Sequence, residues 1–240
     1  SELAKRHHRT PPIVCHENDP FPVKGDVLLL LKTNGGFSAG NNAALRRLYF
    51  TRNECGLFWL LNNDAFPQSD ALTALCERAK PHGEHQADII GSTLVYAADP
   101  SRTQCAGGGM ISPHTGATRF AAGGKPLTAV MRMNSLDVEK NLDYINGASL
   151  LIRREVLDAI GFLPDEYFLY FEDVDMCATA KRAGFKLGWA KQSVVLHMEG
   201  ASHGDGGGIR SKTPAKPRII EYYSTRNRLW FIKKFYPKNL

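Results

Sequence analysis

The sequence lacks the features that mark membrane-spanning, disulfide-bonded and zinc-binding proteins. No apolar run approaches the roughly 20 residues that a membrane-spanning helix needs. No signal-peptide pattern opens the chain. The five cysteines lie far apart without a CxxC pair, and their odd number argues against a disulfide framework. These absences favour reduced thiols and a cytoplasmic setting.

Acidic residues are nearly absent from the C-terminal segment. Residues 210–240 contain nine Lys and Arg but one acid, Glu221, so this segment carries +8 in a chain whose net charge is +6. The preceding residues therefore sum to −2. Because the positive charge is confined to one segment, and no recognised nucleic-acid motif is present, the sequence argues against a nucleic-acid-binding module.

Buried-strand patterns alternate with helical patterns along the first half of the chain. Residues 26–32 predict a fully buried parallel strand, residues 56–61 a second strand and residues 89–96 a third. Helical patterns over residues 42–52 and 69–80 separate them. This order predicts an α/β fold with a mostly parallel sheet flanked by helices. The residues before Asp26, including 13–15, show no further β-α-β unit.

The second half predicts an irregular surface excursion followed by regular elements. The expected elements are the excursion 99–140, a strand 146–153, a short helix 154–160, a helix 172–184, strands 186–189 and 194–197, and a basic aromatic helix 218–235. A glycine-rich loop, 200–208, could order as a lid on donor binding. We therefore predict one α/β domain over residues 1–216 and a C-terminal helix over 217–240, packed on the domain or resting on a membrane surface.

The segment 33–42 predicts a turn-rich loop between a strand and a helix. Its glycines, Gly36 and Gly40 among them, allow close approach of a ligand to the backbone, and amides such as those of Asn41 and Asn42 at a helix start favour a phosphate. The segment matches neither the dinucleotide GxGxxG loop nor a Walker loop. A tight turn without a ligand is the alternative.

Polar side chains end two of the predicted strands. Asn62 and Asp64 follow the second strand, where ligands of open α/β sheets bind, and they suit a divalent cation that also contacts a diphosphate. A polar turn is the alternative. His197 ends the last strand and could complete a metal site, or it could be structural.

Residues 167–175 lead from four aromatics and a leucine into three carboxylates at a helix start. Glu172, Asp173 and Asp175 are candidates for a general base or for metal binding because the aromatic run predicts partial burial. The alternative is that these acids only complement the helix dipole.

Five segments occur in the order found in family 2 glycosyltransferases, and the chain resembles the bacterial rhamnosyltransferase-type members in particular. The segments are GFSAGNN at 36–42, LNND at 61–64, GASLLIR at 147–153, FLYFEDVD at 168–175 and YYSTRNR at 222–228. Ala39 stands where the family commonly has glycine. The family's N-terminal β-α-β unit, which contacts the nucleoside, has no counterpart before Asp26.

The resemblance implies a GT-A-type, Rossmann-like fold and sugar transfer from a nucleotide-sugar with inversion at the anomeric carbon. It implies Asp173 as the base, Glu172 and Asp175 as residues that orient the acceptor or brace the base, and Mg²⁺ or Mn²⁺ held by Asp64 and His197. The acceptor would be a glycan or a polyprenyl-linked saccharide in bacterial cell wall polysaccharide synthesis.

Three other functions stay open on the sequence: a catalytically incompetent fragment or nucleotide-binding protein, a nucleotidyltransferase, and the nucleic-acid-binding module considered above. The missing N-terminal unit leaves a catalytically incompetent fragment or a nucleotide-binding protein as the main alternative. A nucleotidyltransferase would need an early basic phosphate loop, which is absent. The tail interleaves basic and aromatic residues, as interfacial helices do, which predicts peripheral contact with the inner face of the plasma membrane. Packing of those aromatics on the domain is the alternative.

Overall fold

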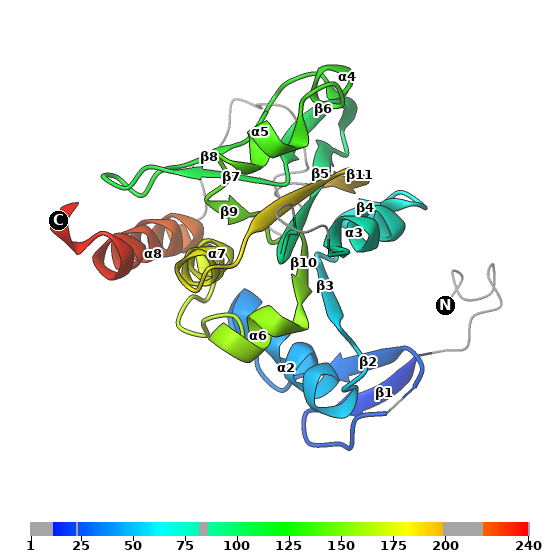
Figure 1. The fold of residues 1–240 in the computed structure, drawn as a ribbon. Helices are drawn as coiled ribbons and strands as arrows, with labels where there is room; N and C mark the ends of the chain where they lie inside the picture. The colour runs from blue at the N-terminus through cyan, green and yellow to red at the C-terminus, as the bar shows by residue number, and fades with distance from the viewer. Residues whose placement is uncertain (1–11, 23, 82–85, 199–217, 240) are drawn as a thin grey trace.

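A computed structural model describes residues 12–22, 24–81, 86–198 and 218–239 of the chain (Figure 1). The predicted lid, 200–208, lies outside the described residues. The strands are β1 (Ile13–His16), β2 (Val27–Leu30), β3 (Leu57–Leu61), β4 (Ala65–Pro67), β5 (Ile89–Tyr96), β6 (Asp99–Ala106), β7 (Gly108–Ile111), β8 (Thr118–Phe120), β9 (Tyr144–Ile145), β10 (Ser149–Arg153) and β11 (Leu187–His197). The helices are α2 (Gly36–Thr51), α3 (Ala71–Ala79), α4 (Leu127–Val130), α5 (Ser135–Glu139), α6 (Arg154–Ile160), α7 (Glu172–Arg182) and α8 (Arg218–Phe235).

The central sheet has the strand order β3-β10-β5-β11-β4, with β6 paired to β5. The α/β class is confirmed, but the prediction of a mostly parallel sheet is wrong. Within this sheet only β5 and β11 pair in parallel, while β10 runs antiparallel to both β3 and β5. Strands β3, β5 and β11 share one direction, as the β-α-β order predicts. The later strand β10 lies between β3 and β5 and therefore separates the two strands.

The two faces of the sheet bury different helices because side chains alternate along each strand. Ile90 and Leu151 point toward α3, where they pack with Leu75. Their neighbours Ile89 and Leu150 lie in the larger core, which also contains buried side chains from α2, α6, α7 and α8. Full burial of each such side chain stabilises the fold by about 1.5–3 kcal/mol. The sheet is thus a layer between α3 and the other helices.

The first two strands form a separate parallel pair. Leu28 and Leu30 are 48% and 41% exposed, so the prediction of a fully buried strand over residues 26–32 is wrong. These leucines are exposed because β2 pairs with β1 in a separate two-stranded sheet and does not extend the central sheet. Residues 13–15, which showed no strand unit in the sequence, belong to β1.

The excursion 99–140 is more regular than its composition suggests. Strand β6 pairs with β5, and β8, β7 and β9 form a three-stranded sheet. Short helices α4 and α5 complete the segment. The two strands predicted over 186–189 and 194–197 are one strand, β11, with a register shift between Ala190 and Val194.

Helix α8 has the predicted bounds and packs on the body of the protein. Phe231, Ile232 and Phe235 are buried in the main core, and the Phe171 and Phe231 rings lie 5.7 Å apart. Along the described ranges of the chain, no helix combines the length and the hydropathy needed to cross a membrane.

Candidate functional site

The turn before α7 has an unusual backbone conformation. Tyr170 and Phe171 adopt φ angles of 68° and 76°, a region that residues other than glycine rarely enter. The fully buried Asn227 of α8 holds this turn, because its Nδ2 donates hydrogen bonds of 2.8 Å to the carbonyls of Leu169 and Tyr170. The chain therefore enters α7 directly after a fixed turn, and the first residue of the helix is Glu172.

Asp173 is held by backbone amides and is only partly buried. Its Oδ2 accepts a hydrogen bond of 3.0 Å from the N–H of Gly147, and its Oδ1 accepts one of 2.8 Å from the N–H of Val174. Burial raises the pKa of Asp173, while these two hydrogen bonds oppose the rise. A carboxylate with a raised pKa and a fixed position is well suited to accept a proton.

Glu172 lies beside this group in a less favourable environment. It is 5% exposed, and its Oε2 accepts no hydrogen bond from the described residues. Burial, followed by the charge of Asp173, raises the pKa of Glu172 well above its ordinary value. Because Asp173 has two amide donors for its charge, Glu172 is the member of the pair that retains a proton more readily.

The Asp175 carboxylate is hydrogen-bonded to other residues of the protein, one of which lies on α8. Its carboxylate accepts hydrogen bonds from the Tyr167 hydroxyl at 2.9 Å and from Lys234 Nζ at 2.8 and 2.9 Å. Asp175 is only 2% exposed, so Lys234 compensates a buried charge. These contacts make Asp175 part of the junction between α7 and α8, and a contact with an acceptor stays a prediction.

Strand pairing brings Asp64 and His197 together. His197 at the end of β11 is paired with Ala65, the residue after Asp64. Its Nε2 lies 3.4 Å from Asp64 Oδ1, and its Nδ1 lies 2.8 Å from Gln104 Oε1. A proton on Nδ1 would donate to the Gln104 oxygen, and in that singly protonated form the Nε2 electron pair would face Asp64. No sequence pattern indicated Gln104, which lies in the excursion.

This arrangement fits a divalent cation. The buried Asp64 Oδ1 accepts no hydrogen bond from the described residues, and it faces an imidazole nitrogen. A proton on Nε2 or a cation between the two groups would compensate the facing electron pairs. Within the described ranges no group of three or more His, Cys, Asp or Glu could hold a metal, so a bound ion would take further ligands from substrate or water.

The predicted loop 33–42 is mostly helical, because α2 begins at Gly36. Gly36 has a φ of 85°, and a Cβ there would lie 2.1 Å from the Phe168 carbonyl oxygen, so only glycine fits. The N–H of Phe37 donates to the same oxygen at 2.8 Å. The start of α2 thus contacts the segment that precedes Asp173.

The other predicted residues of this loop are engaged within the protein or exposed. Asn41 Nδ2 donates to the Phe37 carbonyl, and the buried Asn42 donates to the Leu163 carbonyl and to Asp165. A Cβ at Gly40 would meet no atom within 4 Å. Their predicted contacts with a donor stay predictions.

The residues next to Asp64 and those next to Asp173 meet where β3 and β10 pair. The N–H of Asn62 donates to the Ala148 carbonyl at 3.1 Å, and the preceding residue, Gly147, donates to Asp173. A Cβ on Gly147 would lie 3.2 Å from the Phe37 ring, at the start of α2. Three chain segments that are distant in sequence therefore border one site.

Several buried polar atoms of this region have no hydrogen-bond partner within the described ranges. Among the described residues, six buried side-chain atoms lack a hydrogen-bond partner: Asp64 Oδ1, Glu172 Oε2 and Ser38 Oγ (Ser38 follows Phe37 in α2) belong to the segments described above, and Arg52 Nε, Thr103 Oγ1 and Arg153 Nε are the other three. Buried polar atoms normally find partners, and exceptions call for a ligand, an ion or water. The arrangement can therefore accept a proton at Asp173 and bind a cation or polar ligand nearby.

One family model matches most of the chain, and several curated relatives match parts of it. The model of the family described as "Glycosyltransferase like family 2" matches residues 13–221. N-acetylglucosaminyl-diphospho-decaprenol L-rhamnosyltransferase of Mycobacterium tuberculosis is 31% identical over 80 residues, which are 33% of this chain and 26% of that protein. The low-salt glycan biosynthesis hexosyltransferase Agl10 of Haloferax volcanii is 28% identical over 60 residues, 25% of this chain and 20% of that protein.

The matched segments span between 10% and 26% of the length of the curated relatives. Among solved structures, the mannosyltransferase PcManGT from Pyrobaculum calidifontis, in complex with GDP-Man and Mn²⁺, aligns with a TM-score of 0.43 at 13% identity. That alignment covers 90% of this chain and 55% of the mannosyltransferase chain.

The environment of Glu172 predicts a pH-dependent stability difference. A carboxyl group whose pKa is raised by folding favours the folded state below its unfolded pKa, near 4.5, and this contribution is lost as the pH rises. Glu172→Gln should therefore raise the free energy of unfolding at pH 7.5, and the gain should shrink toward pH 4. Urea denaturation at both pH values measures this. The control Glu166→Gln, at an exposed position, should change stability by less than about 0.5 kcal/mol. A gain for Glu172→Gln that is equal at both pH values would contradict the assignment.

Proposed function

We propose that this chain, which belongs to glycosyltransferase family 2, transfers a sugar from a nucleotide-sugar donor to a saccharide or lipid-linked acceptor with inversion. The observation that carries the proposal is the placement of Asp173. Its carboxylate is fixed by two backbone amides and partly shielded from water. Through Gly147, Ala148 and Asn62 it borders the turn that positions Asp64 and His197.

The chemistry assigned to Asp173 is general-base catalysis of a direct displacement. Asp173 takes the proton from an acceptor hydroxyl, and that oxygen forms a bond to the anomeric carbon. The bond between this carbon and the diphosphate oxygen breaks at the same time, so the electron pair leaves with the nucleoside diphosphate. One displacement inverts the configuration. The raised pKa of Asp173 makes this carboxylate a stronger base than an exposed aspartate.

The leaving diphosphate needs compensation of its developing charge. Asp64 and His197 would hold Mg²⁺ or Mn²⁺, which supplies this compensation when bound. The Phe37 ring at the start of α2 lies beside Gly147, and the N–H groups of Gly36 and Phe37 already donate to Asn34 Oδ1 and the Phe168 carbonyl, so a phosphate at this helix start would take the next amides, beginning at Ser38. Gly36, Gly40, Asn41, Asn42 and Asn62 remain our candidates for the region that borders the donor.

The substrates follow from the relatives' names and from the family resemblance. The M. tuberculosis relative is named for rhamnosyl transfer to a diphospho-decaprenol-linked sugar. This supports rhamnose as the donor sugar and a polyprenyl-linked or glycan acceptor, in bacterial surface polysaccharide synthesis. The alternative is a catalytically incompetent, nucleotide-binding fragment, which would bind a nucleoside diphosphate without turnover.

The base assignment predicts a large loss of turnover in Asp173→Asn. The amide keeps the shape of the side chain but cannot take the proton, so turnover should fall by a factor on the order of 10² to 10⁴. Release of nucleoside diphosphate from UDP-, GDP- and dTDP-sugars, with saccharide and polyprenyl-linked acceptors, measures this. The matched control Asp70→Asn changes an exposed acid and should retain wild-type turnover. If Asp173→Asn retains more than half of wild-type turnover, Asp173 is not the base. If the wild-type protein binds a nucleoside diphosphate but releases none from any nucleotide-sugar, the fragment alternative is favoured.

The metal assignment predicts that nucleotide binding depends on Asp64. Calorimetry should show tighter binding of UDP, GDP or dTDP with Mn²⁺ than with EDTA, because a cation held by Asp64 and His197 would offset the negative charge of the diphosphate. Asp64→Ala should abolish this difference, whereas the control Asp70→Ala should preserve it. Equal affinity of the wild-type protein in Mn²⁺ and in EDTA would show that Asp64 is a turn residue without a metal.

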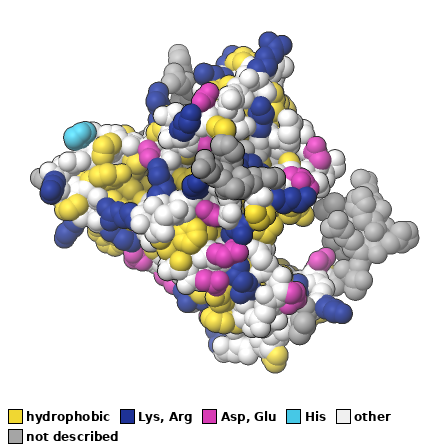
Figure 2. Space-filling model, in the orientation of Figure 1, with side chains coloured by type: hydrophobic (Ala, Val, Ile, Leu, Met, Phe, Trp, Pro, Cys, Tyr) yellow, Lys and Arg dark blue, Asp and Glu magenta, His cyan; other side chains and the backbone are white. Residues whose placement is uncertain are grey.

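We further propose that the outward face of α8 rests on an anionic membrane surface. Ile219, Tyr222, Leu229 and Trp230 are between 42% and 59% exposed and share one side of the helix with Arg226, opposite the buried core side chains. Figure 2 displays hydrophobic and basic side chains together at the end of the molecule where α8 lies in Figure 1. An apolar stripe with basic neighbours matches an interfacial helix, and each basic residue near such a surface contributes about 1 kcal/mol.

Membrane contact predicts salt-sensitive binding to vesicles. The protein should co-sediment with vesicles containing phosphatidylglycerol at low salt, release as salt rises, and ignore neutral vesicles. Leu229→Ser should weaken the binding several-fold, while Leu72→Ser, at a leucine of α3 with 48% exposure, should not. Failure to bind anionic vesicles at low salt would leave α8 with a structural role alone.

A further inference from the structure

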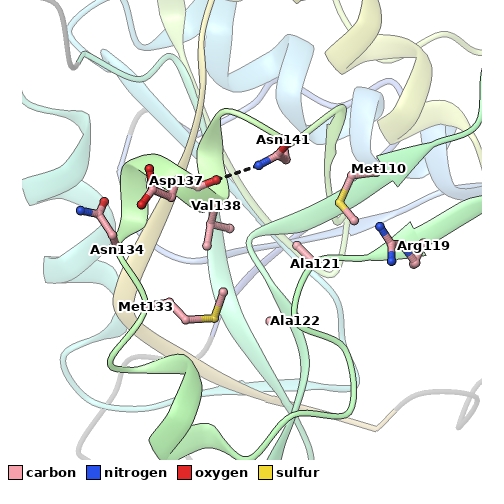
Figure 3. A pocket seen from close by; sticks show the side chains of 9 residues that line it. All are labelled: Met110, Arg119, Ala121, Ala122, Met133, Asn134, Asp137, Val138 and Asn141. Carbon is pink, nitrogen blue, oxygen red and sulfur yellow. Dashed lines mark hydrogen bonds between the residues drawn. The ribbon is translucent and has the colours of Figure 1, made fainter.

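A second concave site lies on the opposite side of the β7–β8 hairpin from α7. Its volume is about 440 Å³, and it opens between this hairpin and α5 (Figures 1 and 3). The residues that line it are Met110, Arg119, Ala121, Ala122, Met133, Asn134, Asp137, Val138 and Asn141. The proposed base and metal residues are not among them. Volumes of this size are typical of sites for small organic ligands.

The floor of this pocket is apolar and adaptable. Ala121 and Val138 belong to the main hydrophobic core, and Met110 and Met133 pack against that core while remaining partly exposed. Figure 3 shows both methionine side chains directed into the space between α5 and the strands. Unbranched thioethers adjust to ligands of varied shape, so the floor suits an aryl or alkyl group.

The rim of the pocket carries one uncompensated charge. Asp137 lies 3.3 Å from Lys140, Asn134 Oδ1 accepts from the Leu136 N–H, and Asn141 Nδ2 donates to a backbone carbonyl. Within the part of the chain that the structure describes, the Arg119 guanidinium makes no such contact. Arg119 is paired across the hairpin with Met110, so both side chains lie on the pocket face of the sheet.

The wall beside the floor contains a strained residue. Ala122 has a φ of 57°, which is uncommon for a residue with a Cβ. The N–H of Lys125 donates to the Ala122 carbonyl at 3.2 Å and closes the turn. Backbone strain of this kind persists where the surrounding structure fixes it, often at sites that bind ligands.

We propose that this pocket binds a small amphipathic anion. The ligand would place an aryl or alkyl body on Met110, Met133 and Val138, and a sulfonate, carboxylate or phosphate group on Arg119. The planar guanidinium of Arg119 can donate two parallel hydrogen bonds to such an oxyanion. The site is separate from the proposed catalytic residues, so its test does not depend on sugar transfer.

Methyl spectroscopy of methionine tests the proposal with internal controls. The chain has five methionines, two of which line the pocket, while Met176 is buried in the core and Met198 follows β11. Titration with 8-anilinonaphthalene-1-sulfonate should shift the ¹³C-methyl resonances of Met110 and Met133 in a saturable manner and leave Met176 and Met198 unchanged. The neutral analogue N-phenyl-1-naphthylamine should bind more weakly. Unmoved Met110 and Met133 resonances would overturn the proposal.

Substitutions at the rim test the role of the charge. Arg119→Gln should weaken binding of the sulfonate about tenfold. Arg119→Lys should restore part of the affinity, because the lysine ammonium keeps the positive charge but lacks the two parallel N–H donors of the guanidinium. The neutral analogue should bind all three proteins equally. Arg132→Gln, an exposed arginine outside the pocket, should bind like the wild type. Equal sulfonate affinity in Arg119→Gln and wild type would contradict an anion site.

Discussion

The left-handed turn at Tyr170 and Phe171 is the constraint on which the candidate site depends. Each of these two residues costs about 1–3 kcal/mol in this conformation, and such turns persist only where other contacts fix them. Asn227 supplies two hydrogen bonds to the turn, and Phe231 packs on Phe171. Without that support α7 would begin elsewhere, and Asp173 would lose its position beside Gly147. The helix farthest along the chain is therefore part of the site.

The same region carries unfavourable electrostatics that the rest of the fold must offset. Glu172 and Asp64 each bury an oxygen that accepts no hydrogen bond from the part of the chain that the structure describes, and such atoms cost about 1–3 kcal/mol apiece. Well-packed side chains such as Leu150 and Ile89 contribute comparable amounts with the opposite sign. The packing on both faces of the sheet therefore offsets the cost of these two buried oxygens.

Local sequence signals predicted the elements but not their neighbours. The bounds of β5, α6 and α8 agree with their patterns, because caps, glycines and apolar periods act within a few residues. The pairing of β10 between β3 and β5, and the exposure of Leu28, depend on which strands meet, which periodicity does not encode. The site residues divide in the same way. Asp64, His197 and Asp173 lie at the ends of strands or at the start of a helix, where the sequence predicted them, whereas Gln104 lies in a segment that the sequence predicted to be irregular.

Helix α8 has a buried face and an outward face on opposite sides. The buried face carries Asn227 and Phe231, which fix the turn before α7, while the outward face carries Leu229 and Tyr222. Because consecutive residues of a helix point in different directions, a change at Leu229 leaves the Asn227 hydrogen bonds in place. The outward face is therefore open to substitution without loss of the turn before α7. A surface that binds this face would hold the same helix that fixes the turn, so attachment and site geometry share one rigid element.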